Sequence, residues 1–188
     1  MPALAVRGRF QRSNFALARA AAEALLGEVE EAEVAAAAAE LTAPGRLEVT
    51  DGDPLVIKDG AHNPAGARAL AESLPELLAG RPLTLVAAVL ADKDAAGVLA
   101  PLLPLAERVV YTGCDNPRAL SPDRLAAVGA ALGGPPSETV AEPSEALERA
   151  RALAGRDGAV LAAGSIYLIA DLARAADPHL AERRVSAL

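Results

Sequence analysis

Residues 58–64, which read Lys-Asp-Gly-Ala-His-Asn-Pro, carry the most distinctive set of polar side chains in the sequence. They follow a short apolar run that predicts a strand, and they precede a stretch with helical spacing. The Asp59 carboxylate can accept hydrogen bonds from a sugar diol. His62 can face a phosphate together with the first amides of the next helix, since a helix N-terminus favours anions, and Pro64 suits a first helical turn. A plain turn closed by Asp59, with a helix capped by Asn63, fits the same spacing, so both interpretations stay open.

Other candidate side chains stand where predicted strands end, which is where ligands gather in parallel α/β sheets. Lys93 follows a continuous apolar run and is one of two lysines in the chain. Ser165 lies between a predicted strand and a helix, another place that favours anions. Asp115, Asn116 and Arg118 form a polar loop after a further strand. Each has a structural alternative: Lys93 as a solvated loop residue, Ser165 as a helix cap, and the loop as an Asx turn.

Two more candidates, Asn14 and Arg46, come from the first quarter of the chain. Ser13 or Asn14 can cap a helix over 15–26, and Arg46 can be a surface charge on an edge strand. A second helix, rich in Ala and Glu, is predicted over 28–41. Two helices of this kind cannot form a core by themselves, which indicates that they belong to something larger.

The elements that must position these side chains alternate between strand and helix from residue 46 onward. Continuous apolar strands separated by amphipathic helices indicate a mostly parallel sheet covered on both faces. We therefore predict an α/β fold, a Rossmann-like three-layer domain with about five to six strands. A frayed tail is expected after the last helix, over 182–188. The predicted strands are 46–50, 55–58, 83–90, 108–112, 138–141 and 159–163, and the predicted helices are 63–78, 94–106, 122–132, 144–154 and 166–175.

The composition argues against several classes of protein. Of the 188 residues, 52% are hydrophobic and 23% are charged, which is typical of a globular protein. The net charge of −7 argues against a surface for nucleic acid or anionic membrane. Cys114 is the single cysteine, so no internal disulfide can form. No apolar run approaches the roughly 20 residues that cross a bilayer, and we expect a cytoplasmic protein that binds neither nucleic acid nor membrane.

Five segments, taken in order, resemble the folylpolyglutamate synthases (dihydrofolate synthase type) of the Mur ligase superfamily. The central one is Asp-Gly-Ala-His-Asn-Pro at 59–64, preceded by Pro-Gly-Arg at 44–46. Gly-Arg-Phe-Gln-Arg-Ser-Asn at 8–14 is similar to the segment that closes the family's central ATPase domain. The remaining matches are Ala-Asp-Lys-Asp at 91–94, Asp-Asn-Pro-Arg-Ala-Leu at 115–120 and Gly-Ser-Ile-Tyr-Leu at 164–168.

The resemblance implies a nucleotide site, with ATP as the nucleotide. Asn14 would contact the adenine, and Asp59 would bind the ribose. Arg46 would reach the terminal phosphate, for which a planar guanidinium is well suited. His62 would lie near the phosphates.

The resemblance also implies a site for the incoming L-glutamate. Lys93, Ser165 and Asn63 would lie in this substrate site. Arg46, His62 and Lys93 would be the catalytic residues of this part of the enzyme. The expected partners are therefore the small molecules ATP, L-glutamate and dihydropteroate or a folate.

The phosphate-binding loop of the family ends in Gly-Lys-Ser or Gly-Lys-Thr, and this sequence has no such motif. It also has no Cys, His and carboxylate residues with metal-ligand spacing, so the Mg²⁺ ligands are expected in the family's central domain, a further partner. We predict that 1–43 is a helical remnant of that domain and that 44–188 is a Mur ligase C-terminal domain. Alone, the chain is expected to bind nucleotide weakly and to catalyse nothing.

The activity that the resemblance implies is ATP-dependent amide formation. ATP phosphorylates a carboxylate of dihydropteroate or a folate, and the amine of glutamate attacks the acyl phosphate with release of ADP and phosphate. A Mur-type ligase for a peptidoglycan precursor and a standalone, non-catalytic binding module remain alternatives. A nicotinamide-binding Rossmann domain is disfavoured, because no Gly-x-Gly-x-x-Gly follows a strand.

Overall fold

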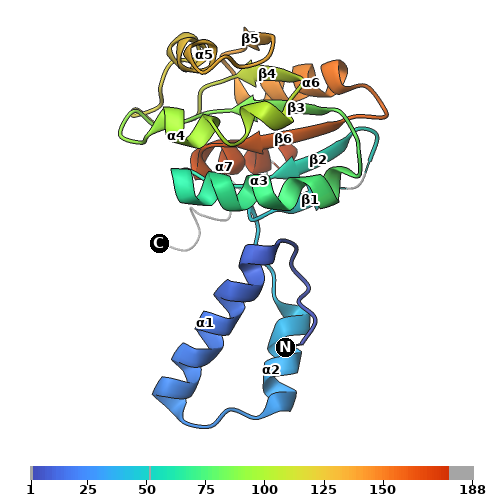
Figure 1. Cartoon of the computed structure of the whole chain (residues 1–188), viewed down its shortest axis with the longest axis vertical. Coiled ribbons are helices and arrows are strands. Elements are labelled where there is room, and N and C mark those ends of the chain that lie inside the picture. Colours follow the sequence, from blue (N-terminus) through green and yellow to red (C-terminus); the bar gives the residue numbers. More distant parts are fainter. Residues whose placement is uncertain (1, 51, 178–188) are drawn as a thin grey trace.

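The computed structural model describes residues 2–50 and 52–177, which form a six-stranded sheet with helices on both faces and a helical hairpin at the N-terminal side (Figure 1). The strand order is β1-β2-β6-β3-β4-β5. β1 pairs with β2 in the antiparallel direction, and every other pair is parallel. The strands are β1 (Glu48–Thr50), β2 (Leu55–Lys58), β3 (Leu83–Ala87), β4 (Arg108–Tyr111), β5 (Ser137–Thr139) and β6 (Ala159–Ala163).

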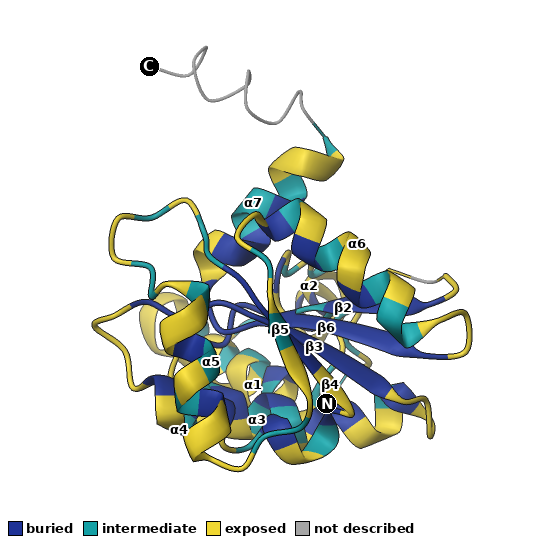
Figure 2. Ribbon diagram, turned by 90° about the horizontal axis from the view of Figure 1, so that it is seen from above, coloured by how far each residue is buried: buried dark blue, intermediate teal, exposed yellow. Residues whose placement is uncertain are grey.

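The sheet separates two apolar layers (Figure 2). One layer packs under α3 (Pro64–Leu78), α4 (Ala95–Leu99), the 3-10 helix Leu103–Leu105 and α5 (Pro122–Ala131). The other packs under α6 (Pro143–Ala154) and α7 (Ile166–Ala176). The predicted three-layer α/β fold is therefore confirmed.

Residues of each strand alternate between the two layers, as the pleat of a strand requires. In β6, Leu161 contributes to the layer under α3, while Val160 contributes to the layer under α6 and α7. In β3, Leu85 and Val86 divide in the same way. Both faces of these strands are buried, which explains why they read as continuous apolar runs. The carboxyl ends of the parallel strands all meet at one edge, where the candidate polar residues follow.

The helical hairpin consists of α1 (Arg9–Leu26) and α2 (Glu31–Glu40), and it projects away from the sheet (Figure 1). Of the described residues of α1, only Gln11 is buried. Leu17 and Leu25 are 72% and 84% exposed. The Arg19 guanidinium bonds to Glu23 and to Glu31, which joins the two helices.

The start of the first helix was predicted wrongly. The helix begins at Arg9, not at residue 15, so Ser13 and Asn14 lie inside it and cap nothing. Gly8, with a φ of 101°, precedes the helix, and Phe10 packs against the core under α3. The segment before residue 15 is basic and lacks the apolar spacing of a helix. The packing of Phe10 against the core stabilises the helix there.

Most other boundaries agree within a few residues. The helix predicted over 94–106 is wrong in length: α4 ends at Leu99, just before Pro101, and only the short 3-10 helix Leu103–Leu105 follows. The strand predicted over 83–90 ends at Ala87, and Leu90 instead forms an isolated bridge with Ala119. The strand predicted over 46–50 starts at Glu48, since Leu47 has a φ of 49°, which an extended strand does not allow. The helix predicted over 28–41 spans Glu31–Glu40.

The sequence also led to expectations about membrane-spanning segments and about the C-terminal tail. None of the helices in the described ranges is long and apolar enough to cross a membrane. The tail predicted over 182–188 lies outside the described residues.

Candidate functional site

Three of the four residues expected at the nucleotide site line one cavity of about 410 Å³. Asn14 comes from α1, Arg46 from the loop before β1, and Asp59 from the end of β2. The cavity therefore lies where the helical hairpin meets the α/β domain. Its lining comprises Phe10, Gln11, Asn14, Ala43, Arg46, Asp59, Ala61, Gly66 and Ala69.

Asp59 is buried at the bottom of this arrangement, with 2% of its surface exposed. Its Oδ2 accepts a hydrogen bond from the Leu47 amide and its Oδ1 accepts one from the Ala61 amide, both at 2.8 Å. Burial raises the pKa of this carboxyl, although the two amides and the charge of Arg46 oppose the shift. Asp59 therefore ties the turn before β1 to the turn after β2.

The turn at 44–47 presents Arg46, whose side chain is exposed. Gly45 has a φ of 67°, and its carbonyl accepts a 2.8 Å hydrogen bond from the Gly60 amide. A Cβ on Gly60 would lie 2.8 Å from Ile166 Cδ1, so the glycine lets this turn pack closely against α7 without displacing that side chain. Within the described part of the chain, no carboxylate lies at ion-pairing distance from Arg46. Its guanidinium is thus available to an anion at the cavity.

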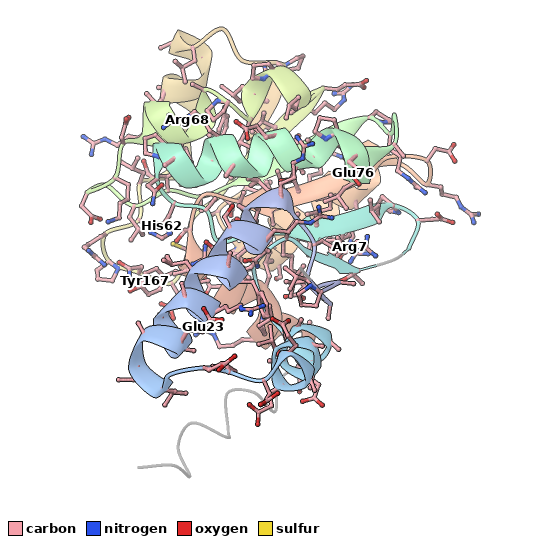
Figure 3. All side chains as sticks on the ribbon, turned by 60° about the horizontal axis from the view of Figure 1, so that its bottom comes forward. Arg7, Glu23, His62, Arg68, Glu76 and Tyr167 are labelled. Atoms are coloured by element: carbon pink, nitrogen blue, oxygen red, sulfur yellow. The ribbon has the colours of Figure 1, made fainter. Side chains whose placement is uncertain are left out.

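His62 and Asn63 follow at the N-terminal end of α3, and Figure 3 shows His62 near the same end of that helix as Arg68. His62 Nδ1 lies 2.9 Å from the Gly60 carbonyl oxygen. A carbonyl accepts only, so Nδ1 is the donor in this contact, and the contact does not engage Nε2. Asn63 Oδ1 accepts a 2.8 Å hydrogen bond from Gly66 N, so it caps the helix as its structural interpretation predicted. Neither residue is part of the cavity lining.

Lys93 lies in the loop after β3, about one third exposed, with its Nζ 3.3 Å from Asp92 Oδ2. Arg118 Nη1 lies 3.2 Å from the same oxygen. The structure therefore brings two of the predicted segments, the loops at 91–94 and 115–120, together around Asp92. The Arg118 amide also donates to Asn116 Oδ1 at 2.9 Å, which supports the Asx-turn interpretation of the second loop.

Ser165 follows β6 and is almost fully buried, with 1% exposed. Its Oγ accepts a hydrogen bond from the Tyr167 amide at 3.1 Å and so caps α7. Cys114 Sγ lies 3.9 Å from the same oxygen. Burial raises the pKa of the Cys114 thiol, and the nearby carboxylates of Asp171 and Asp115 raise it further. The hydroxyl of Ser165 is thus committed to local contacts.

The candidate residues consequently fall into two groups. Asn14, Arg46 and Asp59 share the cavity, whereas Lys93 and Ser165 lie elsewhere. Because β2, β6 and β3 are neighbours and run parallel, Asp59, Ser165 and Lys93 still follow the same edge of the sheet. In residues 2–50 and 52–177, no cluster of three or more His, Cys, Asp or Glu side chains has metal-binding geometry.

One residue in the cavity lining, Gln11, was missed as a candidate. It is buried, with 7% exposed, and its Oε1 accepts a 3.0 Å hydrogen bond from Asn14 Nδ2. A polar residue three positions before Asn14 lies on the same face of a helix. A helix predicted from residue 15 leaves both Gln11 and Asn14 outside it, so this spacing becomes informative only with a helix that begins at Arg9.

Comparisons with known proteins define the class. Residues 45–166 match the family model "Mur ligase, glutamate ligase domain". The match covers the sheet and the turns that carry Arg46 and Asp59. The chain therefore belongs to the Mur ligase glutamate ligase domain family, and the resemblance noted in the sequence is confirmed.

Individual relatives narrow the class further. A dihydrofolate synthase/folylpolyglutamate synthase of Mycobacterium tuberculosis is 41% identical over 144 residues, which are 74% of this chain and 30% of that protein. Its namesake in Bacillus subtilis is 29% identical, over 88% of this chain and 39% of that protein.

Solved structures agree with the sequence relatives. Mycobacterium tuberculosis folylpolyglutamate synthase complexed with ADP and AMPPCP superposes with a TM-score of 0.84 at 37% identity, covering 92% of this chain and 41% of that one. Escherichia coli FolC in complex with DHPP and ADP gives a TM-score of 0.81 at 28% identity, covering 95% of this chain and 41% of that one. This chain thus spans less than half the length of the relatives that it matches.

Proposed function

We propose that this chain is the C-terminal part of an ATP-dependent ligase that adds L-glutamate to dihydropteroate, to folates or to both. The observation that carries the proposal is the cavity that Asn14, Arg46 and Asp59 share. The similarity to folylpolyglutamate synthases supports the choice of this branch of the Mur ligases over the peptidoglycan branch. Residues 1–43 would belong with the central ATPase domain and 44–188 would form the C-terminal domain.

The nucleotide would occupy this cavity. The amide of Asn14 would meet the adenine, and the Asp59 carboxylate, which still has free lone pairs, would accept from the ribose. The Arg46 guanidinium, which has no ion-pair partner among the described residues, would bind the terminal phosphate. His62 would approach the phosphates through Nε2, the ring nitrogen that the Gly60 carbonyl leaves free.

The reaction would pass through an acyl phosphate. A carboxylate of the pterin substrate takes the terminal phosphoryl group of ATP, and the glutamate amine then displaces phosphate to form the amide. The glutamate would lie near Lys93, Ser165 and Asn63. Lys93 would have to break its ion pair with Asp92 before it could bind a carboxylate of the glutamate. Rate would come from holding two reactants together and from cationic groups near the developing negative charge.

Mg²⁺ accompanies ATP in reactions of this kind, but the described residues supply no carboxylate cluster for it. Its ligands would therefore come from the central domain, and no step here depends on the metal. We place the reaction in the cytoplasm, in keeping with a chain whose one cysteine is unpaired. The chain alone is expected to bind nucleotide without turnover.

Calorimetric titration of AMPPCP into the 188-residue chain tests the nucleotide site. The Arg46→Ala variant should weaken binding about tenfold or more, because a charge-assisted contact is lost. Arg124→Ala, which removes another exposed arginine from α5, should bind as the wild type does. Equal binding by all three proteins, or none by the wild type, would contradict the proposal.

A second experiment separates the alternative functions. The central domain of a relative is added in trans with ATP, L-glutamate and either dihydropteroate, a folate or a peptidoglycan precursor, and ADP release is followed. Turnover with the pterins supports the ligase proposed here. Turnover with the peptidoglycan precursor would move the chain to the other branch, and AMPPCP binding without turnover in any mixture would favour a binding module.

A further inference from the structure

Gln11 is the one described residue of α1 that is buried, and it is a polar one. A helix that projects into solvent usually buries apolar side chains where it touches the rest of the protein. Here the buried contact is a primary amide at the wall of the cavity. Burying an amide is costly unless it is hydrogen-bonded, so its bonding partner defines what it does.

That partner is Asn14, one helical turn further along α1. Asn14 Nδ2 donates to Gln11 Oε1 at 3.0 Å, and both residues line the cavity. Within the described ranges, no group donates a hydrogen bond to Asn14 Oδ1. Asn14 therefore offers a ligand one acceptor, Oδ1, and the second N–H of its amide.

The bond between the two amides also couples their orientations. It requires one donor and one acceptor, so turning the Asn14 amide over requires turning the Gln11 amide as well. In the reversed arrangement Gln11 Nε2 would donate to Asn14 Oδ1, and Asn14 would offer the ligand mainly N–H groups. The two arrangements suit different purines: adenine presents an amino donor beside the N7 acceptor, whereas a 6-oxopurine presents acceptors at both places.

We propose that Gln11 is a positioning residue that sets the amide orientation of Asn14 and so selects a 6-aminopurine over a 6-oxopurine. This inference rests on the proposed function, in which the cavity holds the base of a nucleotide. Gln11 itself need not touch the base. Its acceptor oxygen holds one N–H of Asn14 and leaves the acceptor–donor pair that adenine matches.

Calorimetry with ADP and IDP, which differ at the 6-position and N1 of the base, tests the inference on the 188-residue chain. Gln11→Glu keeps the acceptor and should preserve the wild-type preference for ADP. Gln11→Met keeps the size of the side chain but cannot hold the amide, and the ratio of ADP to IDP affinity should fall about tenfold, in the range of one amide–base pair. Gln11→Lys, which can only donate, should lower the ratio at least as far.

The ratio distinguishes positioning from a general loss of structure. A variant that merely loosens α1 weakens ADP and IDP equally and leaves the ratio unchanged, so an unchanged ratio in Gln11→Met overturns the inference. A loss in Gln11→Glu as large as in Gln11→Met overturns it too, as does a wild type that binds ADP and IDP equally well. Ser13→Ala, on the exposed side of the same helix, is the matched control. Absence of ADP binding by the wild type would instead overturn the proposed function on which the inference rests.

Discussion

The helical hairpin and the α/β domain differ in how each is held together. The domain buries both faces of its central strands under two layers of helices, and Leu161 at its centre has no exposed surface. The hairpin exposes Leu17 and Leu25; Arg19 links its two helices, and Phe10 packs against the core of the domain. Yet the cavity needs both parts. The α/β domain supplies Arg46 and Asp59, and the hairpin supplies Asn14.

The difference teaches that the apolar core and the ligand cavity use largely different residues, with Asp59 serving both stability and the cavity. Leu161 and its neighbours in the middle of the sheet do not line the cavity, and their loss should unfold the domain. Residues of the hairpin should alter binding while leaving the domain folded. The following predictions test this separation, beginning with the largest expected effect.

Truncation of Leu161 should show how much the domain core contributes to the free energy of unfolding. Leu161→Ala leaves a cavity in the middle of the sheet and should lower the free energy of unfolding by about 2–5 kcal/mol. Leu25→Ala in the hairpin should change it by less than about 0.5 kcal/mol, because that side chain is exposed. Urea denaturation followed by circular dichroism measures both. A comparable cost for Leu25→Ala would show that the hairpin is covered in solution and would break the comparison.

Removal of the Asp59 carboxyl should have an intermediate effect. Asp59→Ala leaves the buried amides of Leu47 and Ala61 without their acceptor and should destabilise the chain by about 1–3 kcal/mol. Asp157→Ala, in an exposed turn, is the control and should be nearly neutral. If the two variants melt alike, the carboxylate does not hold the two turns together.

The same variant carries a pH signature. Burial raises the pKa of Asp59 in the folded chain, so its contribution to stability is full below the ordinary aspartate pKa and is lost as pH rises through the raised value. The stability difference between wild type and Asp59→Ala should therefore be larger near pH 4 than at pH 7. The opposite trend would mean that the amides and Arg46 outweigh burial.

Loss of the Arg19 contacts should have the smallest effect, confined to the hairpin. Arg19→Ala removes the link from α1 to Glu31 on α2, and hydrogen exchange of the α2 amides should become faster. Arg149→Ala removes a similar two-bonded pair with Glu138 in the α/β domain and should leave α2 exchange unchanged. Faster α2 exchange in both variants would indicate that the two regions are coupled more tightly than their contacts suggest.

The sequence predicted those parts of the fold that depend on local pattern. β2 and β6 were predicted to the residue, because apolar runs of strand length are bounded there by turns. The start of α1 was missed, since it depends on Phe10 packing against a core that forms from distant segments. The position of β6 between β2 and β3 was equally out of reach, because strand order follows from long-range pairing.

The candidate site was predicted unevenly for the same reason. The motifs singled out Arg46 and Asp59, but nothing in their spacing states that Asn14 reaches the same cavity. Nor could spacing show that Ser165 is buried against Cys114, which lies 51 positions earlier in the chain. Gln11 was the avoidable omission, because a helix begun at Arg9 places it directly below Asn14.

The location of β6 in the sheet affects how the protein folds while it is being synthesised. Among the strands of the described residues, β6 is synthesised last, but it separates β1 and β2 on one side from β3, β4 and β5 on the other. Until residue 163 has emerged, a nascent chain holds two incomplete half-sheets with open inner edges, which are prone to wrong pairing. The nascent chain should therefore depend on chaperones until late in translation, when β6 pairs with both β2 and β3 and completes the sheet.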